Sequence, residues 1–192
     1  SAVLGMLQSQ LASQQNASVL QTFKQYHEVL NATDNAIACY LAGSAHQLVG
    51  QHEEALALFA IASRQVSSPV HDRTLYKIAV IRYELGQLED TKRVLDMLTV
   101  DHPLSKLNQD GQFLLATVLT SQNDINRAVA QFSFIINQHN NHPYYADSLY
   151  RRAQLYDTDN QLETALKDYE MFLQCSEGRP NQQQAASLRI ID

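Results

Sequence analysis

Two histidines, His139 and His142, have the spacing of two metal ligands on one turn of a helix. Asn140, Asn141 and Pro143 stand between and after them, and these residues predict a boundary between helices rather than a regular helix. No cysteine or carboxylate cluster stands beside the pair to complete a metal site. We therefore interpret the segment as a solvated loop, and we expect no metal and no cofactor.

Catalysis by Cys39 would require an exposed thiol beside a base. We expect Cys39 to point inward from a helix and Cys175 to be a small buried residue, and one distant pair is no disulfide framework. The six glycines are scattered singly, so no glycine-rich loop can hold a phosphate. An active site would need another domain. We therefore predict that the chain is not an enzyme.

The segment from Asp157 to Asn160 resembles the opening of a calcium-binding loop. However, a helix is expected to begin at Gln161, and no glycine supplies the sharp bend that such a loop needs. We interpret this segment as a turn between two helices.

The chain carries 14 basic and 20 acidic side chains, which gives a net charge of −6. This balance offers no electrostatic footprint for a polyphosphate, so we expect no nucleic acid partner. The longest apolar run is residues 55–62, whereas a membrane-spanning helix needs about 20 residues. We expect a soluble chain without membrane insertion. The cysteines favour a reducing cytoplasm and permit the bacterial periplasm, so both compartments stay open.

A pattern of small, turn and aromatic residues recurs along the chain. It is set by Gly43, Gly50, Ala55, Phe59 and Ala62, and it returns after 36 or 37 residues. The later copies are Ala79, Gly86, Thr91, Leu95 and Leu98, then Ala116, Asn123, Ala128, Phe132 and Ile135, then Ala153, Asn160, Ala165, Tyr169 and Phe172. The turn positions hold Gly or Asn, the residue types that most readily accept a left-handed backbone. The repeats therefore predict helical hairpins.

The same period extends backwards to Leu7, Gln14, Val19, Phe23 and Tyr26. The aromatic register survives there, but the small residues and the turn residue do not. Terminal repeats are expected to be atypical, because one of their faces has no neighbour. We interpret residues 1–33 as a degenerate leading repeat.

This pattern resembles the tetratricopeptide repeat, with a small residue in the first helix, an Ala early in the second and Pro near the repeat boundary. The residues that carry it are Gly43, Gly50, Ala55, Phe59 and Pro69, then Ala79, Gly86 and Pro103, then Ala116, Ala128, Phe132 and Pro143, then Ala153, Tyr156, Ala165 and Tyr169. The resemblance implies an all-α fold, a right-handed superhelix (α-solenoid) of about five hairpins in a single domain over residues 1–192. The repeats would cover about 1–33, 34–69, 70–106, 107–143 and 144–180, and residues 181–192 would be a capping helix or a truncated next repeat.

Apolar periodicity and helix breakers place the helices. First helices are expected at about 2–13, 35–49, 71–85, 107–121 and 144–158, and second helices at about 17–30, 52–66, 88–100, 124–138 and 161–175. Two antiparallel helices can cross closely only where one presents Gly or Ala to a ring of the other. Enlarging such a residue, as in Ala79→Leu, should destabilise the fold by about 1 to 3 kcal/mol.

The resemblance also implies which side chains line a concave groove formed by the first helices. They are Tyr40, Ser44, Gln47, Arg73, Tyr76, Lys77, Val80, Tyr83, Phe113, Thr117, Thr120, Tyr150, Arg151 and Gln154. The set is rich in Tyr and contains three basic groups, a composition typical of binding hot spots. Alternatively, several of these tyrosines cover seams between helices. We predict that the groove binds a peptide or partner helix of acidic and apolar character.

One function of the resembled family is not expected. Its co-chaperones grip the acidic tails of heat-shock chaperones with a Lys and an Asn in the first helix of one pair. The matching positions hold Tyr40 and Ser44, Tyr76 and Val80, or Phe113 and Thr117, so that two-carboxylate clamp is missing.

Three hypotheses for the function remain. The first is a scaffold or adaptor for protein–protein interaction. The second is a bacterial envelope protein that assists outer-membrane or cell-wall assembly, because the segment from His142 to Leu173 is similar to repeats of such proteins. The third is a self-associating subunit, such as a homodimer, that pairs through an exposed apolar face at the leading repeat or at Leu188, Ile190 and Ile191.

Overall fold

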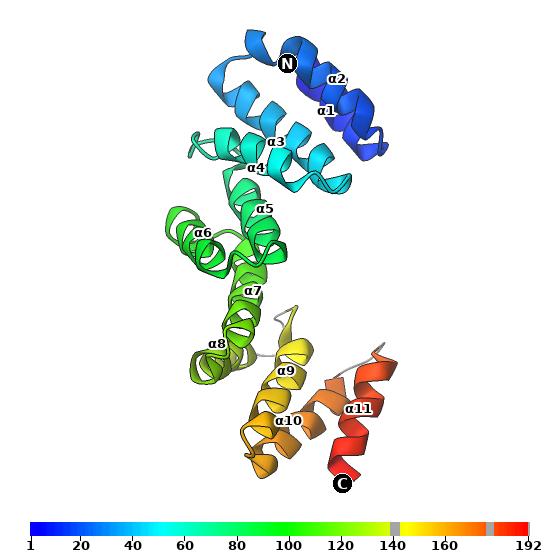
Figure 1. Cartoon of the computed structure of the whole chain (residues 1–192), viewed down its shortest axis with the longest axis vertical. Helices are drawn as coiled ribbons and strands as arrows, with labels where there is room; N and C mark the ends of the chain where they lie inside the picture. Colours follow the sequence, from blue (N-terminus) through cyan, green and yellow to red (C-terminus); the bar gives the residue numbers. More distant parts are fainter. Residues whose placement is uncertain (139–142, 176–178, 192) are drawn as a thin grey trace. The chain divides into compact units, whose positions relative to one another are not determined.

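The computed structural model describes residues 1–138, 143–175 and 179–191. Over these residues the chain forms eleven α-helices, one short 3-10 helix and no strand (Figure 1). The predicted all-α fold of helical hairpins is confirmed. No described helix is both long enough and apolar enough to cross a membrane.

The helices have the following bounds. They are α1 (Ala2–Ala12), α2 (Asn16–Tyr26), η1 (His27–Val29), α3 (Ala32–Leu48), α4 (His52–Ala62), α5 (His71–Glu84), α6 (Leu88–Asp101), α7 (Leu107–Ser121), α8 (Ile125–Asn137), α9 (Tyr145–Thr158), α10 (Leu162–Cys175) and α11 (Pro180–Ile191).

The largest differences from the expected bounds lie in the leading half of the chain. The second helix ends at Tyr26 rather than near residue 30, and η1 follows it. Helix α3 begins at Ala32 rather than at 35, because the Asn31 side chain accepts the N–H of Asp34 at 2.8 Å and caps the helix three residues earlier.

The described chain divides into two compact units, Ser1–Leu107 (unit 1) and Asn108–Asp192 (unit 2). In unit 1, α1 and α2 pack against each other and against α3, α3 packs against α4, and α5 packs against α6 (Figure 1). In unit 2, α9 packs against α8 and α10, and α10 packs against α11. Each unit has its own apolar clusters, so each is described by itself.

One kind of turn closes all five hairpins. The residue with positive φ is Gln14 (57°), Gly50 (76°), Gly86 (72°), Asn123 (56°) or Asn160 (60°). The next N–H donates to the carbonyl five residues back, as from Gln51 to His46 at 2.9 Å, which is the Schellman arrangement of a helix end. The predicted turn positions at 50, 86, 123 and 160 are confirmed.

The leading hairpin corrects one sequence interpretation. Gln14 has no glycine-like freedom, yet it adopts φ 57° and makes the same turn, with the N–H of Gln15 bonded to the carbonyl of Gln10 at 2.9 Å. Leu7 and Val19, which flank the turn on the two helices, are completely buried. Their packing therefore holds a hairpin that the residue at the turn does not favour.

The predicted close contact between paired helices is present at Gly43. A Cβ atom on Gly43 would lie 2.8 Å from Cε1 of Phe59 and 3.3 Å from the carbonyl oxygen of Ala55. The ring of Phe59 therefore lies directly over the bare backbone of α3. Residues at the same repeat position in α5, α7 and α9, namely Ala79, Ala116 and Ala153, are completely buried.

Aspartates in the first turns of α5, α7 and α9 bind residues of the segment that follows in the same unit. Asp72 accepts from the hydroxyl of Ser105 at 2.7 Å, Asp110 from Tyr144 at 2.5 Å, and Asp147 binds Arg179 at 2.9 Å. An acid in this place also interacts favourably with the helix dipole. These bonds tie each first helix to the repeat after it.

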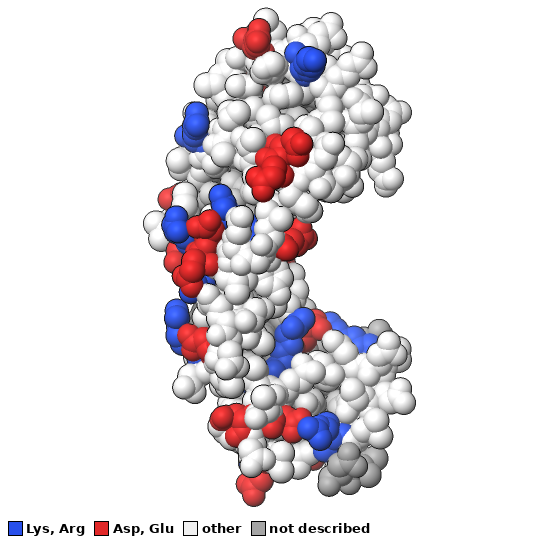
Figure 2. Space-filling view, viewed as in Figure 1, with Lys and Arg blue, Asp and Glu red and all other residues white. Residues whose placement is uncertain are grey.

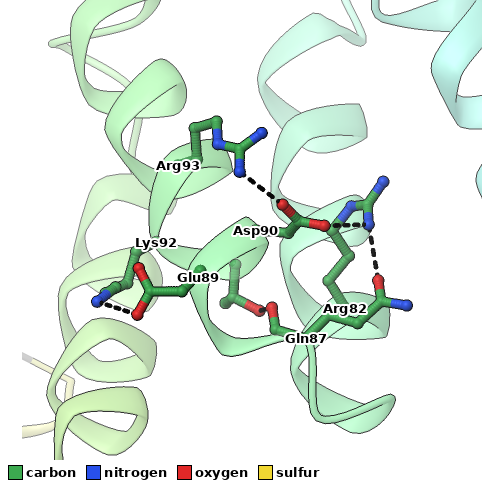
Figure 3. Close-up of polar contacts among 7 residues, drawn as sticks. Arg82, Gln87, Glu89, Asp90, Lys92 and Arg93 are labelled. Atoms are coloured by element: carbon green, nitrogen blue, oxygen red, sulfur yellow. Dashed lines mark hydrogen bonds and ion pairs between the residues drawn. The ribbon is translucent and has the colours of Figure 1, made fainter.

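Polar side chains also hold hairpins together. At the turn between α5 and α6, Arg82 binds Gln87 at 2.6 Å and Asp90 at 2.9 Å, and Arg93 binds the other oxygen of Asp90 at 2.8 Å (Figure 3). Nearby on α6, Lys92 pairs with Glu89 at 2.8 Å. These groups are largely exposed, so they contribute little to stability individually.

Unit 2 contains a buried ion pair that the sequence analysis did not find. Arg152 of α9 donates two bonds of 2.7 Å to the carboxylate of Asp168 on α10, and a third of 2.7 Å to the hydroxyl of Ser133 on α8. The Asp168 side chain is 4% exposed and that of Arg152 is 16% exposed. Although burial alone would lower it, the pKa of Arg152 is raised by the hydrogen bonds and charge of Asp168. The pair joins three helices.

Candidate protein-binding groove

Unit 1 contains a groove of about 520 Å³ between α3, α5 and the start of α7. Its lining residues are Tyr40, Gln47, Arg73, Tyr76, Lys77, Val80 and Leu107. All of these except Leu107 belong to the set that the sequence analysis assigned to a groove. The structure therefore brings them together, and their role in binding stays a prediction.

Helix periodicity explains why these residues share one wall. Arg73, Tyr76, Lys77 and Val80 follow one another at intervals of three, one and three residues, which places them on one face of α5. Tyr40 and Gln47 stand two turns apart on α3. The opposite faces of both helices are buried, as at Ala38 and Ala79. The groove is thus the face that hairpin packing leaves uncovered.

The cations of the groove are not matched by carboxylates. The ammonium of Lys77 donates to the neutral side-chain oxygen of Gln47 at 2.8 Å, and burial lowers the pKa of Lys77. Arg73 is exposed, one helical turn away from Lys77. Among the described residues neither cation forms an ion pair. The groove is therefore electropositive in a chain whose net charge is negative.

Tyr40 takes part both in the packing of α3 on α4 and in the wall of the groove. Its ring centroid lies 6.0 Å from that of Phe59, so the tyrosine covers the α3–α4 contact while its side chain also lines the groove. Burial raises the pKa of Tyr40, an effect that the nearby Arg73 opposes. At this position a tyrosine can therefore both line the groove and cover the contact between two helices.

Four residues predicted for the groove are not among those that line it. Ser44 is buried, and its hydroxyl donates to the carbonyl of Tyr40 at 2.8 Å. The hydroxyls of Thr117 and Thr120 donate in the same way to the carbonyls of Phe113 and Ala116, each at 2.9 Å. Each hydroxyl is used within its own helix, so these residues offer no free donor to a ligand. Tyr83 is half-buried near the end of α5 and does not line the groove.

The predicted residues of unit 2 fall into two places. Phe113 stacks on Tyr144 with ring centroids 4.4 Å apart, and the guanidinium of Arg151 lies 5.4 Å from the Phe113 ring. Tyr150 and Gln154 instead line a pocket of about 410 Å³ between α9 and α11.

Ion pairs link α11 to α9 beside this pocket. Arg189 binds Asp157 at 2.6 Å near the end of both helices, and Arg179, just before α11, binds Asp147 near the start of α9. Ala186 is the only side chain of α11 that is fully buried among those described. A helix is therefore present where a capping helix or a truncated next repeat was predicted, and it is held both by ion pairs to α9 and by the packing of Ala186 and Ile190 in an apolar cluster of unit 2.

The structure describes some of the residues that the sequence analysis considered for catalysis or metal binding. Cys39 is 2% exposed, and burial raises the pKa of its thiol to about 11, whereas Cys175 is half-buried. His139 and His142 lie outside the described residues. In the described ranges, no three metal-ligating side chains gather at one point. On the face drawn in Figure 2, acidic and basic side chains form small mixed groups among uncharged surface.

Comparison with known proteins identifies the repeat. A sequence profile described as the tetratricopeptide repeat matches residues 73–105, which include most of α5 and all of α6. The chain contains a tetratricopeptide repeat. The resemblance predicted from the sequence is thereby confirmed. No curated protein matches the chain at a significant level.

Solved structures share this tetratricopeptide fold. YrrB, described as a TPR protein with an unusual peptide-binding site, superposes with a TM-score of 0.75 at 17% identity, over 96% of this chain and 90% of that one. A MamA RS-1 double mutant gives 0.76 at 12% identity over 93% and 94%. The TPR-like repeats of a putative kinesin light chain from Podosopora anserina give 0.69 at 16% identity over 91% and 93%. Identities this low establish the fold alone.

Proposed function

We propose that this chain is a protein-interaction scaffold that holds a segment of a partner protein in the groove of unit 1. The observation that carries the proposal is the uncompensated pair of cations, Arg73 and Lys77, beside the apolar side chains of Val80 and Leu107. A segment with a carboxylate next to apolar residues complements both features. The peptide-binding site named for the structurally similar YrrB is consistent with this function.

Aromatic side chains add to the support. Tyr40 and Tyr76 line the groove, and tyrosine gives a large contact area with few rotatable bonds. A ligand carboxylate would replace or join Gln47 as the partner of Lys77. Because a hydrogen bond between charged groups contributes about 1.5 to 3 kcal/mol, loss of Lys77 should weaken binding at least tenfold.

Selection of random dodecapeptides displayed on phage tests the proposal. We expect enriched peptides that place Asp or Glu beside apolar residues, and we expect their affinity for the Lys77→Glu variant to fall at least tenfold. Arg64→Glu is the matched control, because Arg64 is exposed elsewhere in unit 1 and makes the same change in net charge. Peptides that bind Lys77→Glu as well as the unaltered chain would rule out this groove.

Unit 2 allows a second comparison within the same experiment. Arg151→Glu also reverses one charge at a predicted groove position, but Arg151 lies against Phe113 rather than in the groove of unit 1. Peptides held by unit 1 alone should bind this variant with unchanged affinity. A loss equal to that of Lys77→Glu would show that both units contribute to the ligand site.

A further inference from the structure

Two cations stand side by side on the wall of the unit 1 groove. Arg73 and Lys77 are four residues apart on α5, a spacing that puts their Cβ atoms about 6 Å apart on one face of the helix. Like charges at this spacing destabilise a helix. Their nearest acidic neighbour in sequence, Asp72, is already engaged with the backbone N–H of Arg73 and with the Ser105 hydroxyl, each at 2.7 Å.

Three other cations of unit 1 are paired with carboxylates. Arg82, Arg93 and Lys92 each bind a carboxylate at 2.8 or 2.9 Å (Figure 3). Among the described residues Arg73 and Lys77 have no such partner, and they stand one helical turn apart on α5. A single ligand carboxylate would neutralise one of these two cations and leave the other cation without a counter-charge.

We infer that the groove recognises a phosphorylated side chain of the partner segment, and this inference rests on the proposed function of the groove. A phosphoryl group carries nearly two negative charges and three acceptor oxygens, so it can bind both cations together. The planar guanidinium of Arg73 can donate two parallel bonds to such a group, and the Lys77 ammonium can act as a compact point charge.

The surroundings suit a side chain rather than a free ion. Val80 and Leu107 give the groove an apolar wall, and Tyr40 and Tyr76 add aromatic surface. These groups contribute nothing to a bare anion, but they can pack against the residues that flank a phosphorylated one. Lys77 is partly withdrawn from water, and burial lowers its pKa, so its ammonium gains more from a counter-charge than an exposed lysine would.

Four peptide pools that differ at one site test the inference. Each pool has the same mixture of apolar and polar residues in its flanks, and the centre is phosphoserine, glutamate, two adjacent glutamates or serine. Affinity for the whole chain is measured by fluorescence anisotropy at pH 7.5. We expect phosphoserine to bind about tenfold more tightly than glutamate, and glutamate more tightly than serine.

Variants assign the preference to the two cations. Arg73→Gln and Lys77→Gln should each reduce the advantage of phosphoserine over glutamate to about twofold or less. Arg64→Gln and Lys24→Gln are the matched controls, because both residues are exposed elsewhere in unit 1, and the advantage should persist in them. Circular dichroism spectra should be the same for all five chains.

Acidity gives a second readout. The second pKa of a phosphoserine is about 6, whereas the side-chain pKa of glutamate is about 4.3. Lowering the pH from 7.5 to 5.5 should therefore weaken the phosphoserine pool severalfold and leave the glutamate pool almost unchanged. An equal response of both pools would contradict a dianionic ligand.

The outcomes separate this inference from the proposed function. If glutamate or paired glutamates bind as well as phosphoserine, and better than serine, the phosphoryl inference is wrong while the groove still binds acidic segments. If all pools bind equally or none binds, both are wrong. If inorganic phosphate displaces the phosphoserine pool as strongly as an unlabelled copy of that pool does, the site binds a free anion, and segment recognition is overturned.

Discussion

The two units build the same hairpins but treat their charges differently. In unit 1, the ammonium of Lys77 is bonded to a neutral amide, and a groove stays open beside it. In unit 2, a pocket also lies between α9 and α11, but the carboxylates of Asp147 and Asp157 on α9 are paired with arginines. The charges beside this pocket are therefore paired within the chain, whereas Arg73 and Lys77 in the groove of unit 1 form no ion pair among the described residues.

The interiors of the two units also differ in how they use charge. Unit 1 brings helices together by close approach of backbone and ring, as at Gly43 and Phe59. Unit 2 adds the buried pair of Arg152 and Asp168 to its packing. A buried charge that loses its partner typically costs about 3 to 5 kcal/mol, whereas overpacking at a close contact costs about 1 to 3 kcal/mol. Substitutions at these contacts should therefore change the free energy of unfolding by different amounts in the two units.

The largest effect is expected for Asp168→Asn in unit 2. The amide would leave the Arg152 guanidinium without a counter-charge in a largely buried place, which should lower the free energy of unfolding by about 3 to 5 kcal/mol. Urea denaturation measures the change. Glu170→Gln, on the exposed face of the same helix, removes the same charge and should change stability by less than about 0.5 kcal/mol. Equal effects of the two variants would show that the ion pair contributes nothing special.

Gly43→Ala is expected to have the next largest effect, in unit 1. The added methyl group would overlap the edge of the Phe59 ring at 2.8 Å, and the nearby backbone oxygen of Ala55 limits its retreat. Such overpacking should destabilise the fold by about 1 to 3 kcal/mol. Gly5→Ala is the matched control, because no atom lies within 4 Å of its new Cβ, and alanine should stabilise α1 by up to about 1 kcal/mol. Thermal unfolding distinguishes the opposite signs, and a stabilised Gly43→Ala would refute the close contact.

Repeat features were predictable where the backbone demands a particular residue type. A left-handed turn favours Gly or Asn, so Gly50, Gly86, Asn123 and Asn160 could be read from the sequence. Most of the groove lining was predicted as well, because the resemblance to the tetratricopeptide repeat implies which helix positions face the groove. Gln14 could not be predicted, because the packing of the leading hairpin imposes its conformation against the preference of the residue.

Contacts between neighbouring helices were harder to predict. Arg151 was assigned to the groove, while the adjacent Arg152, rotated by about 100° around α9, forms the buried ion pair. Nothing local in the sequence connects Arg152 to Asp168 on the next helix. Leu107 was missed for a related reason, since it enters the groove of unit 1 from the start of α7 rather than from the helices that form its main walls.

Alkaline pH gives another test of unit 2. Burial, assisted by the negative charge of Asp157, raises the pKa of Tyr169 to about 12, whereas an unfolded tyrosine ionises near pH 10. The neutral phenol is thus favoured by folding, so its contribution is complete below pH 10 and is lost as the pH rises towards 12. The loss should be at most about 1.4 kcal/mol per pH unit.

Comparison of Tyr169→Phe with the unaltered chain isolates this contribution. The difference in unfolding free energy between the two chains should be constant up to pH 10 and should shift in favour of the phenylalanine variant between pH 10 and 12. A constant difference for Tyr169→Phe across the whole range would contradict the raised pKa.

The turn of the leading hairpin predicts a gain in stability. A residue other than glycine in the left-handed region is strained by about 1 to 2 kcal/mol, while glycine has a more flexible unfolded state, so Gln14→Gly should stabilise unit 1 by about 1 kcal/mol or less. Gly50→Ala makes the reverse change at an equivalent turn and should destabilise by a similar amount. Thermal unfolding of both variants checks the signs, and a destabilised Gln14→Gly would mean that the glutamine side chain itself supports the turn.

The smallest effect concerns the docking of α11 in unit 2. Its ion pairs are partly exposed, and such pairs contribute about 1 kcal/mol or less and weaken in salt. Hydrogen exchange of α11 amides should therefore accelerate severalfold in Arg189→Gln, and 1 M NaCl should bring the unaltered chain close to that rate. The amides of α10, which is anchored by the buried Phe172, should not respond to either change. If α11 exchanges as slowly as α10 under both conditions, apolar contacts rather than ion pairs hold α11 in place, and charge pairing does not distinguish unit 2 from unit 1.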